Sequence, residues 1–188
     1  VISNPLTLQI EFRAKKFNAV SPRILHIGVK ENKNLPRLIE ALSTIPCKLV
    51  IVGKPSKVVR ELLAKHVIQH EIKMNISQHE IIAEYYLCDV LAFVSTYEGF
   101  GLPIIEAQAT GRVVLTSNVA SMPEVAGKGA LLVDPFAVNE IKEGILKIIK
   151  DPEFRATLIA YGRSNAQRFN PSTIAKQYST LYNKVLND

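Results

Sequence analysis

The sequence has few cysteines and no arrangement of side chains suited to a metal ion. Cys47 and Cys88 are the two cysteines among 188 residues, and both stand in apolar surroundings at no metal-ligand spacing. Each is predicted to be a small buried hydrophobe and not half of a disulfide, which is typical of a reducing cytoplasm. No aspartate pair suited to a divalent ion occurs, so metal-independent chemistry without a cofactor is expected. The histidines, which show no metal-ligand spacing either, are His26, His66, His70 and His79.

Long hydrophobic runs are also absent. Apolar strings such as Leu49–Val52 end after a few residues, far short of the roughly 18 that a membrane-spanning helix needs. A content of 47% hydrophobic and 21% charged residues excludes disorder and indicates a globular domain with a well-buried core. The chain opens at Val1 without an initiator methionine or a signal sequence, so we expect it to be part of a longer protein.

The excess of basic residues is modest, with a net charge of +6. Such a charge suits nucleic acid, acidic lipid head groups or phosphorylated ligands. No nucleic-acid partner is expected, because the basic residues are spread along the chain and no aromatic-rich strand accompanies them. Arg13, Lys15 and Lys16 form a small basic group that could contact an acidic membrane, although solvated surface charge explains them equally well.

Short apolar strings alternate with amphipathic stretches, which is typical of a parallel sheet with helices on both faces. We therefore expect an α/β fold, a Rossmann-like three-layer α/β/α domain with one parallel sheet and C-terminal helices. The six predicted strands, each nearly all apolar as buried parallel strands are, comprise Ile24–Ile27, Leu49–Val52, Ile72–Met74, Val90–Val94, Val113–Thr116 and Ala130–Val133.

Helices are predicted between and after these strands. Ser77 and Glu80 form a capping box ahead of one helix, while Asp151-Pro152 and Asn170-Pro171 precede two C-terminal helices. Residues 1–22 lack periodicity and contain two prolines, so they are predicted to be an interdomain linker to the folded domain of residues 23–188. The apolar faces of two other helices comprise Leu35, Leu38, Ile39 and Leu42, and Ile141, Ile145, Ile148 and Ile149.

The loop Ser95–Pro103 is the most distinctive candidate for chemistry. It follows a predicted strand, and ligands of open α/β sheets bind beyond the carboxyl ends of strands. Gly99 and Gly101 would let the backbone approach a ligand, and the start of the following helix favours phosphate, so the loop is predicted to cradle an anion. A tight turn that needs glycine only for its dihedral angles is the alternative explanation.

Two glutamates accompany this loop: Glu98 within it and Glu106 one turn inside the helix. Acids would repel a diphosphate, but ionised carboxylates accept hydrogen bonds from the vicinal hydroxyls that flank the phosphates of a sugar nucleotide. Taken singly, Glu106 is also explained as a first-turn glutamate favoured by the helix dipole, and Glu98 as a solvated loop charge.

Together these residues resemble the signature of family 4 glycosyltransferases, which are retaining enzymes of GT-B architecture. The resemblance covers essentially the whole chain. It is carried by Gly28, Lys33-Asn34-Leu35, Glu98-Gly99-Phe100-Gly101-Leu102-Pro103, Glu106-Ala107, Thr116-Ser117-Asn118, Pro123-Glu124-Val125 and Leu132-Val133-Asp134-Pro135.

The resemblance implies that the chain is the C-terminal, donor-binding half of an enzyme that moves a sugar from a nucleoside diphosphate sugar to a glycan or lipid-linked acceptor. The acceptor site would belong to an N-terminal domain outside this sequence, so the chain alone would bind donor and transfer little. The expected reaction is the transfer of a hexose such as mannose to a growing cell-surface polysaccharide. The enzyme is expected to be cytoplasmic and to act at the inner face of the membrane.

Specific roles follow from the resemblance. It implies that Glu106 binds the ribose hydroxyls, that Glu98 lies against the donor sugar, and that Lys33 neutralises the leaving diphosphate, which makes Glu98 and Lys33 the catalytic candidates. The amides of Gly99, Phe100 and Gly101 would hold sugar and phosphate. The complete set of donor-binding candidates is Gly28, Lys30, Lys33, Gly53, Lys54, Met74, Ile76, Glu98, Gly99, Phe100, Gly101, Leu102 and Glu106.

The sequence departs from the family pattern at Val29, where an arginine is common. Lys30 is a substitute that offers a point charge in place of a bidentate fork. Gly53-Lys54 follows the second strand, where it either lines the site or forms an exposed turn. Met74–Ile76 follows the third strand, where the family seats the base, although Met74 also suits the core.

Two other function classes compete with this interpretation. A non-catalytic nucleotide-binding module would need Glu106 and little at Glu98. A dehydrogenase-type domain is disfavoured, because the first strand ends in Gly28-Val29-Lys30 without the glycine series that cradles a pyrophosphate there.

Overall fold

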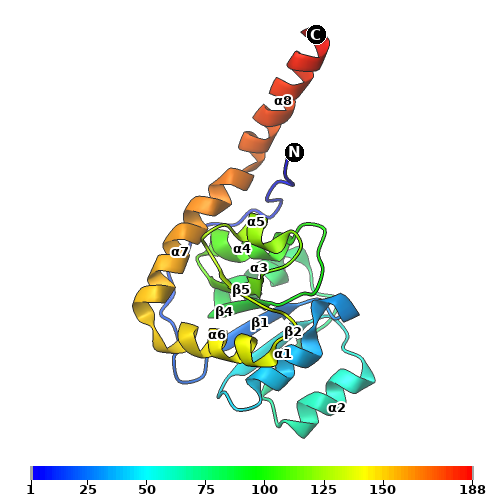
Figure 1. Cartoon of the computed structure of the whole chain (residues 1–188), viewed down its shortest axis with the longest axis vertical. Coiled ribbons are helices and arrows are strands. Elements are labelled where there is room, and N and C mark those ends of the chain that lie inside the picture. Colours follow the sequence, from blue (N-terminus) through cyan, green and yellow to red (C-terminus); the bar gives the residue numbers. More distant parts are fainter. Residues whose placement is uncertain (1, 188) are drawn as a thin grey trace.

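Six parallel strands form the centre of the computed structural model, which describes residues 2–187 (Figure 1). Their order across the sheet is β3-β2-β1-β4-β5-β6, and every neighbouring pair is parallel. The α/β fold and all six predicted strands are confirmed. The strands are β1 (Arg23–Ile27), β2 (Lys48–Val52), β3 (His70–Lys73), β4 (Val90–Phe93), β5 (Val113–Ser117) and β6 (Leu131–Val133).

The predicted bounds were wrong by one or two residues, most of all at β3. This strand begins at His70 and not at Ile72, and it ends at Lys73, one residue before Met74. It lies at the sheet edge, where polar residues are tolerated, so an apolar string marked only part of it. Val94 and Ala130 likewise lie just outside β4 and β6.

Helices cover both faces of the sheet. One face packs against α1 (Leu35–Leu42), α2 (Lys57–Lys65) and α6 (Val138–Lys150). The other packs against α3 (Gln78–Leu87), α4 (Leu102–Thr110) and α5 (Met122–Ala126). The remaining elements are η1 (Glu31–Lys33), α7 (Pro152–Ala166), η2 (Gln167–Phe169) and α8 (Pro171–Asn187).

Local signals set several of these helix ends. The Ser77 hydroxyl and the Glu80 carboxylate form the predicted capping box of α3. Pro103 lies in the first turn of α4, and Gly111 ends that helix in the left-handed region at φ 79°. The predicted capping box is therefore confirmed.

The predicted linker has no regular secondary structure and runs along the surface of the domain. The amide of Leu6 donates to the carbonyl of Phe169 at 2.7 Å. Lys15 forms an ion pair with Asp89, and the guanidinium of Arg13 lies 4.1 Å from the centre of the Tyr86 ring. Two of the three basic residues are thus engaged within the protein, which reduces the charge available to a membrane surface. The division of the chain at residue 22 stays a prediction.

Helix α8 leaves the body of the domain and projects beyond it, beside the described end of the N-terminal segment (Figure 1). Within residues 2–187, no helix is both long enough and apolar enough to cross a membrane. The buried core lies at the sheet, and α8 adds little to it beyond Ile174 in its first turn.

Gly129, in the loop before β6, packs closely against Gly162 of α7. A Cβ at Gly129 would lie 2.4 Å from the Cα of Gly162. Gly129→Ala should therefore lower the free energy of unfolding by about 1–3 kcal/mol, measured by urea denaturation. Gly99→Ala is the matched control, because its Cβ would meet no atom within 4 Å. Equal stability of the two variants would contradict this account of the interface.

Candidate functional site

The site lies at the carboxyl ends of β1 and β4, where the sheet order reverses direction. Lys33 comes from η1 after β1, and Glu98 comes from the loop after β4. The Lys33 Nζ lies 2.6 Å from Glu98 Oε1, and the two side chains are only 18% and 14% exposed. The structure therefore brings the two predicted catalytic residues together as a largely buried ion pair.

Gly28 makes room for the lysine. It has φ 93°, and a Cβ there would lie 2.8 Å from Lys33 Cε. The ammonium also lies 4.6 Å from the centre of the Phe93 ring, which favours a cation electrostatically. An ammonium has three donors, so the bond to Glu98 leaves others for an anionic ligand.

Two polar residues that no sequence motif marks as part of the site hold the loop around Glu98. Asn32 Nδ2 donates to the Tyr97 carbonyl at 2.9 Å and lies 3.3 Å from Glu98 Oε1. The Ser121 hydroxyl lies 2.9 Å from the Glu98 carbonyl oxygen and 2.7 Å from that of Phe100. Asn32 stands beside Lys33 in the sequence, but nothing in the spacing indicates that Ser121 contacts this loop.

The glycine loop leads directly into α4. Gly101 has φ 108° at the N-cap, and Leu102 begins the helix, so the positive dipole end of α4 lies at this edge of the sheet. Gly99 has open space where a side chain would stand. The Phe100 ring packs edge-on against Phe169, with ring centres 5.8 Å apart, so its ring is engaged in the fold. This geometry can accept an anion against backbone amides.

Glu106 is held separately from Glu98. It lies inside α4 and is 9% exposed, and its Oε2 accepts a hydrogen bond from the Tyr85 hydroxyl at 2.5 Å. Burial raises the pKa of Glu106, and the hydrogen bond from Tyr85 opposes that shift. No spacing in the sequence relates Tyr85 to Glu106, because an inward aromatic residue of a helix is usually part of the core.

The other candidates lie at the carboxyl ends of β1, β2 and β3 without joining this cluster. Lys30 and Lys54 are exposed, and Ile76 is half-buried. Gly53 has φ 129° and donates its amide to Lys73. Met74 is 49% exposed, so the alternative that it belongs to the core is wrong. Their roles as ligand contacts stay predictions.

Beneath the site, His26 is fully buried in β1 with Nδ1 3.0 Å from the Ala92 carbonyl oxygen. Desolvation lowers the pKa of His26 to about 4, and the charge of Lys33 acts in the same direction. The imidazole is therefore neutral near pH 7.

The cysteines are buried and free, as predicted, and burial raises the pKa of Cys47 to about 11 and that of Cys88 to about 12. Neither thiol is thus a nucleophile at neutral pH. Among residues 2–187, no three histidine, cysteine, aspartate or glutamate side chains are grouped to hold a metal ion.

Comparison with known proteins gives consistent matches. The family model described as glycosyl transferases group 1 matches residues 9–165. O-antigen chain mannosyltransferase B from Escherichia coli is 30% identical over 170 residues, which cover 84% of this chain and 45% of that protein. The chain thus spans less than half the length of this relative.

Solved structures share the architecture described above. Sucrose-phosphate synthase from Thermosynechococcus elongatus superposes with a TM-score of 0.86 at 25% identity, covering 99% of this chain and 52% of that one. HepE from Anabaena, in complex with UDP and glucose, superposes with a TM-score of 0.80 at 23% identity, covering 88% and 49%. The predicted three-layer fold with a parallel six-stranded sheet is confirmed.

His26 predicts a distinctive dependence of stability on pH. The unfolded chain takes up the histidine proton near pH 6.5 and the folded protein only near pH 4, so stability from this group is complete above pH 6.5 and falls as the pH falls toward 4. We expect a loss of about 2 kcal/mol between pH 6.5 and 4.5, measured by urea denaturation. His26→Gln should remove this slope, while His79→Gln, at an exposed histidine, should keep it. A slope unchanged in His26→Gln would show that the imidazole is not the group responsible.

Proposed function

Since the chain belongs to the glycosyl transferases group 1 family, we propose that it is the donor-binding domain of a retaining hexosyltransferase of the mannosyl type. This membership confirms the family resemblance read from the sequence. The observation that carries the proposal is the Lys33–Glu98 ion pair, which stands at the switch point of the sheet beside the first turn of α4.

The proposed donor is a nucleoside diphosphate sugar. A cation beside a glycine loop and the positive end of a helix suits a diphosphate, and carboxylates nearby suit the hydroxyls of ribose and sugar. Two relations outside the chain support this choice: the similar O-antigen enzyme is a mannosyltransferase, and the structurally similar HepE was solved with UDP and glucose. The proposed acceptor is a glycan or lipid-linked oligosaccharide of a cell-surface polysaccharide, met at the cytoplasmic face of the membrane.

Each residue then has a role in glycosyl transfer. Lys33 stabilises the negative charge that develops on the diphosphate as the glycosidic bond breaks. Glu98, already oriented by Lys33 and Asn32, accepts hydrogen bonds from the donor sugar, and Glu106 accepts them from ribose. Since an ammonium and the positive end of α4 supply the positive charge, we propose that the leaving group needs no metal ion.

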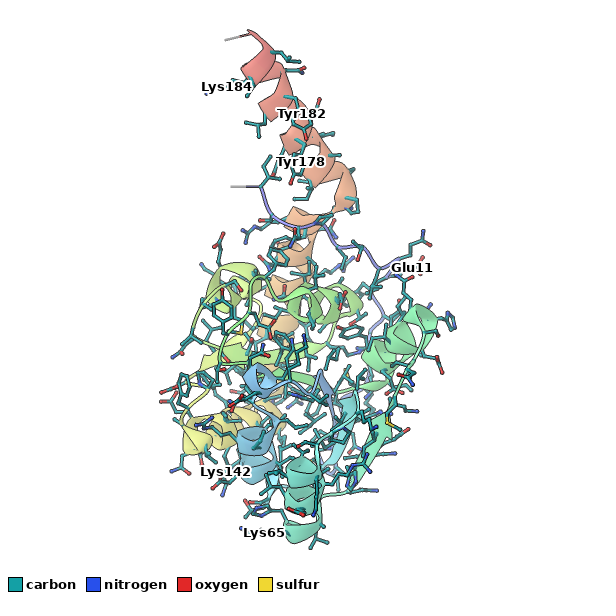
Figure 2. All side chains as sticks on the ribbon, turned by 90° about the vertical axis from the view of Figure 1, so that its right-hand side faces the viewer. Glu11, Lys65, Lys142, Tyr178, Tyr182 and Lys184 are labelled. Atoms are coloured by element: carbon teal, nitrogen blue, oxygen red, sulfur yellow. The ribbon has the colours of Figure 1, made fainter. Side chains whose placement is uncertain are left out.

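The proposed partner is an N-terminal acceptor domain of the same protein. Helix α8 carries an apolar stripe at helical spacing, formed by Tyr178, Leu181, Tyr182 and Val185, each of which is more than 40% exposed. Figure 2 shows Tyr178 and Tyr182 on the projecting part of α8, away from the sheet. Such a stripe is typical of a contact surface, and the O-antigen relative has more than half of its length outside the matched region to cover it.

Donor binding can be measured by calorimetric titration with UDP, GDP, ADP and their sugar conjugates, with and without EDTA. We expect one nucleotide to bind, more tightly as its sugar conjugate, with no effect of EDTA. Glu106→Ala should weaken binding by about tenfold, because it removes a charged acceptor. Glu143→Ala, at an exposed glutamate of α6, should leave binding unchanged. Absence of binding by every nucleotide at millimolar concentration would contradict donor binding by this chain.

A second variant separates a transferase half from a module that binds nucleotide alone. Glu98→Gln keeps the size of the side chain and removes its charge. It should therefore weaken binding of the sugar nucleotide by about tenfold and leave binding of the plain nucleotide unchanged. Glu31→Gln, at an exposed neighbour in η1, is the control. Equal affinity of Glu98→Gln and wild type for the sugar nucleotide would favour the non-catalytic module.

A further inference from the structure

Tyr85 is a fully buried residue of α3 whose hydroxyl lies 2.5 Å from Glu106 Oε2. The two residues come from neighbouring helices on the same face of the sheet. A carboxylate has two oxygens and about four acceptor sites, so this bond occupies one oxygen and leaves Oε1 to other donors. The hydroxyl thereby fixes which way the carboxylate faces.

The position of the Tyr85 hydroxyl is itself set by the fold. Arg112 Nε donates to the Tyr85 carbonyl at 2.9 Å, and the Cys88 thiol lies 3.3 Å from the same oxygen. The ring belongs to the buried cluster that includes Leu91 and Ile105. Because backbone and ring are held independently of Glu106, the hydroxyl is a fixed donor to which the carboxylate orients.

This arrangement also keeps the carboxylate a good acceptor. Burial disfavours the charged form of Glu106, whereas a hydrogen bond to the carboxylate favours it. Burial and the nearby carboxylate raise the pKa of Tyr85, so its hydroxyl stays protonated and able to donate throughout the neutral range. The pair therefore presents an oriented charged acceptor in the helix that follows the glycine loop.

We propose that Tyr85 is a positioning residue that enforces selection of ribonucleotide donors by holding Glu106 toward the ribose hydroxyls. The inference rests on the proposed function, because it takes Glu106 as the ribose ligand. A site whose buried acceptor needs a hydroxyl rejects analogues that lack it, since the acceptor is then left unpaired. The chain should accordingly discriminate against nucleoside diphosphates with a deoxygenated ribose.

The test compares affinities for GDP and 2′,3′-dideoxy-GDP, and in parallel for UDP and 2′,3′-dideoxy-UDP, by calorimetry. Wild type should prefer the ribose form of the nucleotide it binds by about tenfold or more. Tyr85→Phe removes only the hydroxyl, so it should reduce this preference to about threefold or less through weaker binding of the ribose form alone. Tyr86→Phe is the matched control on the same helix, because its hydroxyl bonds to the backbone of Glu11 and not to Glu106.

Three results would overturn the inference. Full preference for ribose in Tyr85→Phe would show that the hydroxyl does not orient Glu106. Equal weakening of ribose and dideoxy forms would show a merely structural role, and urea denaturation of the variant would reveal the accompanying loss of stability. A wild type that binds no nucleoside diphosphate would contradict the proposed function, and the inference about Tyr85 would fall with it.

Discussion

The parallel pairing of β1 with β4 is the constraint on which the site depends. These strands lie side by side at the centre of the sheet, although β2 and β3 separate them in the sequence. Their carboxyl ends deliver Lys33 and Glu98, 65 residues apart in the chain, to within 2.6 Å. Packing of helices on both faces of the sheet fixes the positions of the strands. The geometry of the ion pair therefore depends on the core as well as on the loops.

Glu98 and Glu106, which seven residues separate, lie in different environments because α4 begins between them. Glu98 precedes the helix and is neutralised by Lys33 at the edge of the sheet. Glu106 lies one turn inside α4, where the Tyr85 hydroxyl of α3 reduces the cost of burying its charge. Glu98 thus has an ionic partner and Glu106 a neutral hydrogen-bond donor. This difference suits the proposed binding of sugar hydroxyls by Glu98 and of ribose hydroxyls by Glu106.

The sequence patterns predicted the fold well where burial dominates and less well where it does not. Central strands such as β4 and β5 are buried throughout, so their apolar strings marked them directly. Edge strand β3 includes His70, Glu71 and Lys73, and its polar residues concealed where it starts. Met74 also differs from what its residue type suggests. An apolar side chain suits a core position, but β3 has already ended at Lys73 and the Met74 side chain is exposed.

Periodicity and local backbone preferences were enough to predict the parallel α/β class, the capping box of Ser77 and Glu80, and a glycine loop accompanied by two acids. The groups that hold each acid, in contrast, follow from how separate elements pack together. Asn32 and Ser121 reach Glu98, and Tyr85 reaches Glu106, across contacts between separate elements. Such contacts depend on strand order and helix packing, which bring together residues that no local spacing relates.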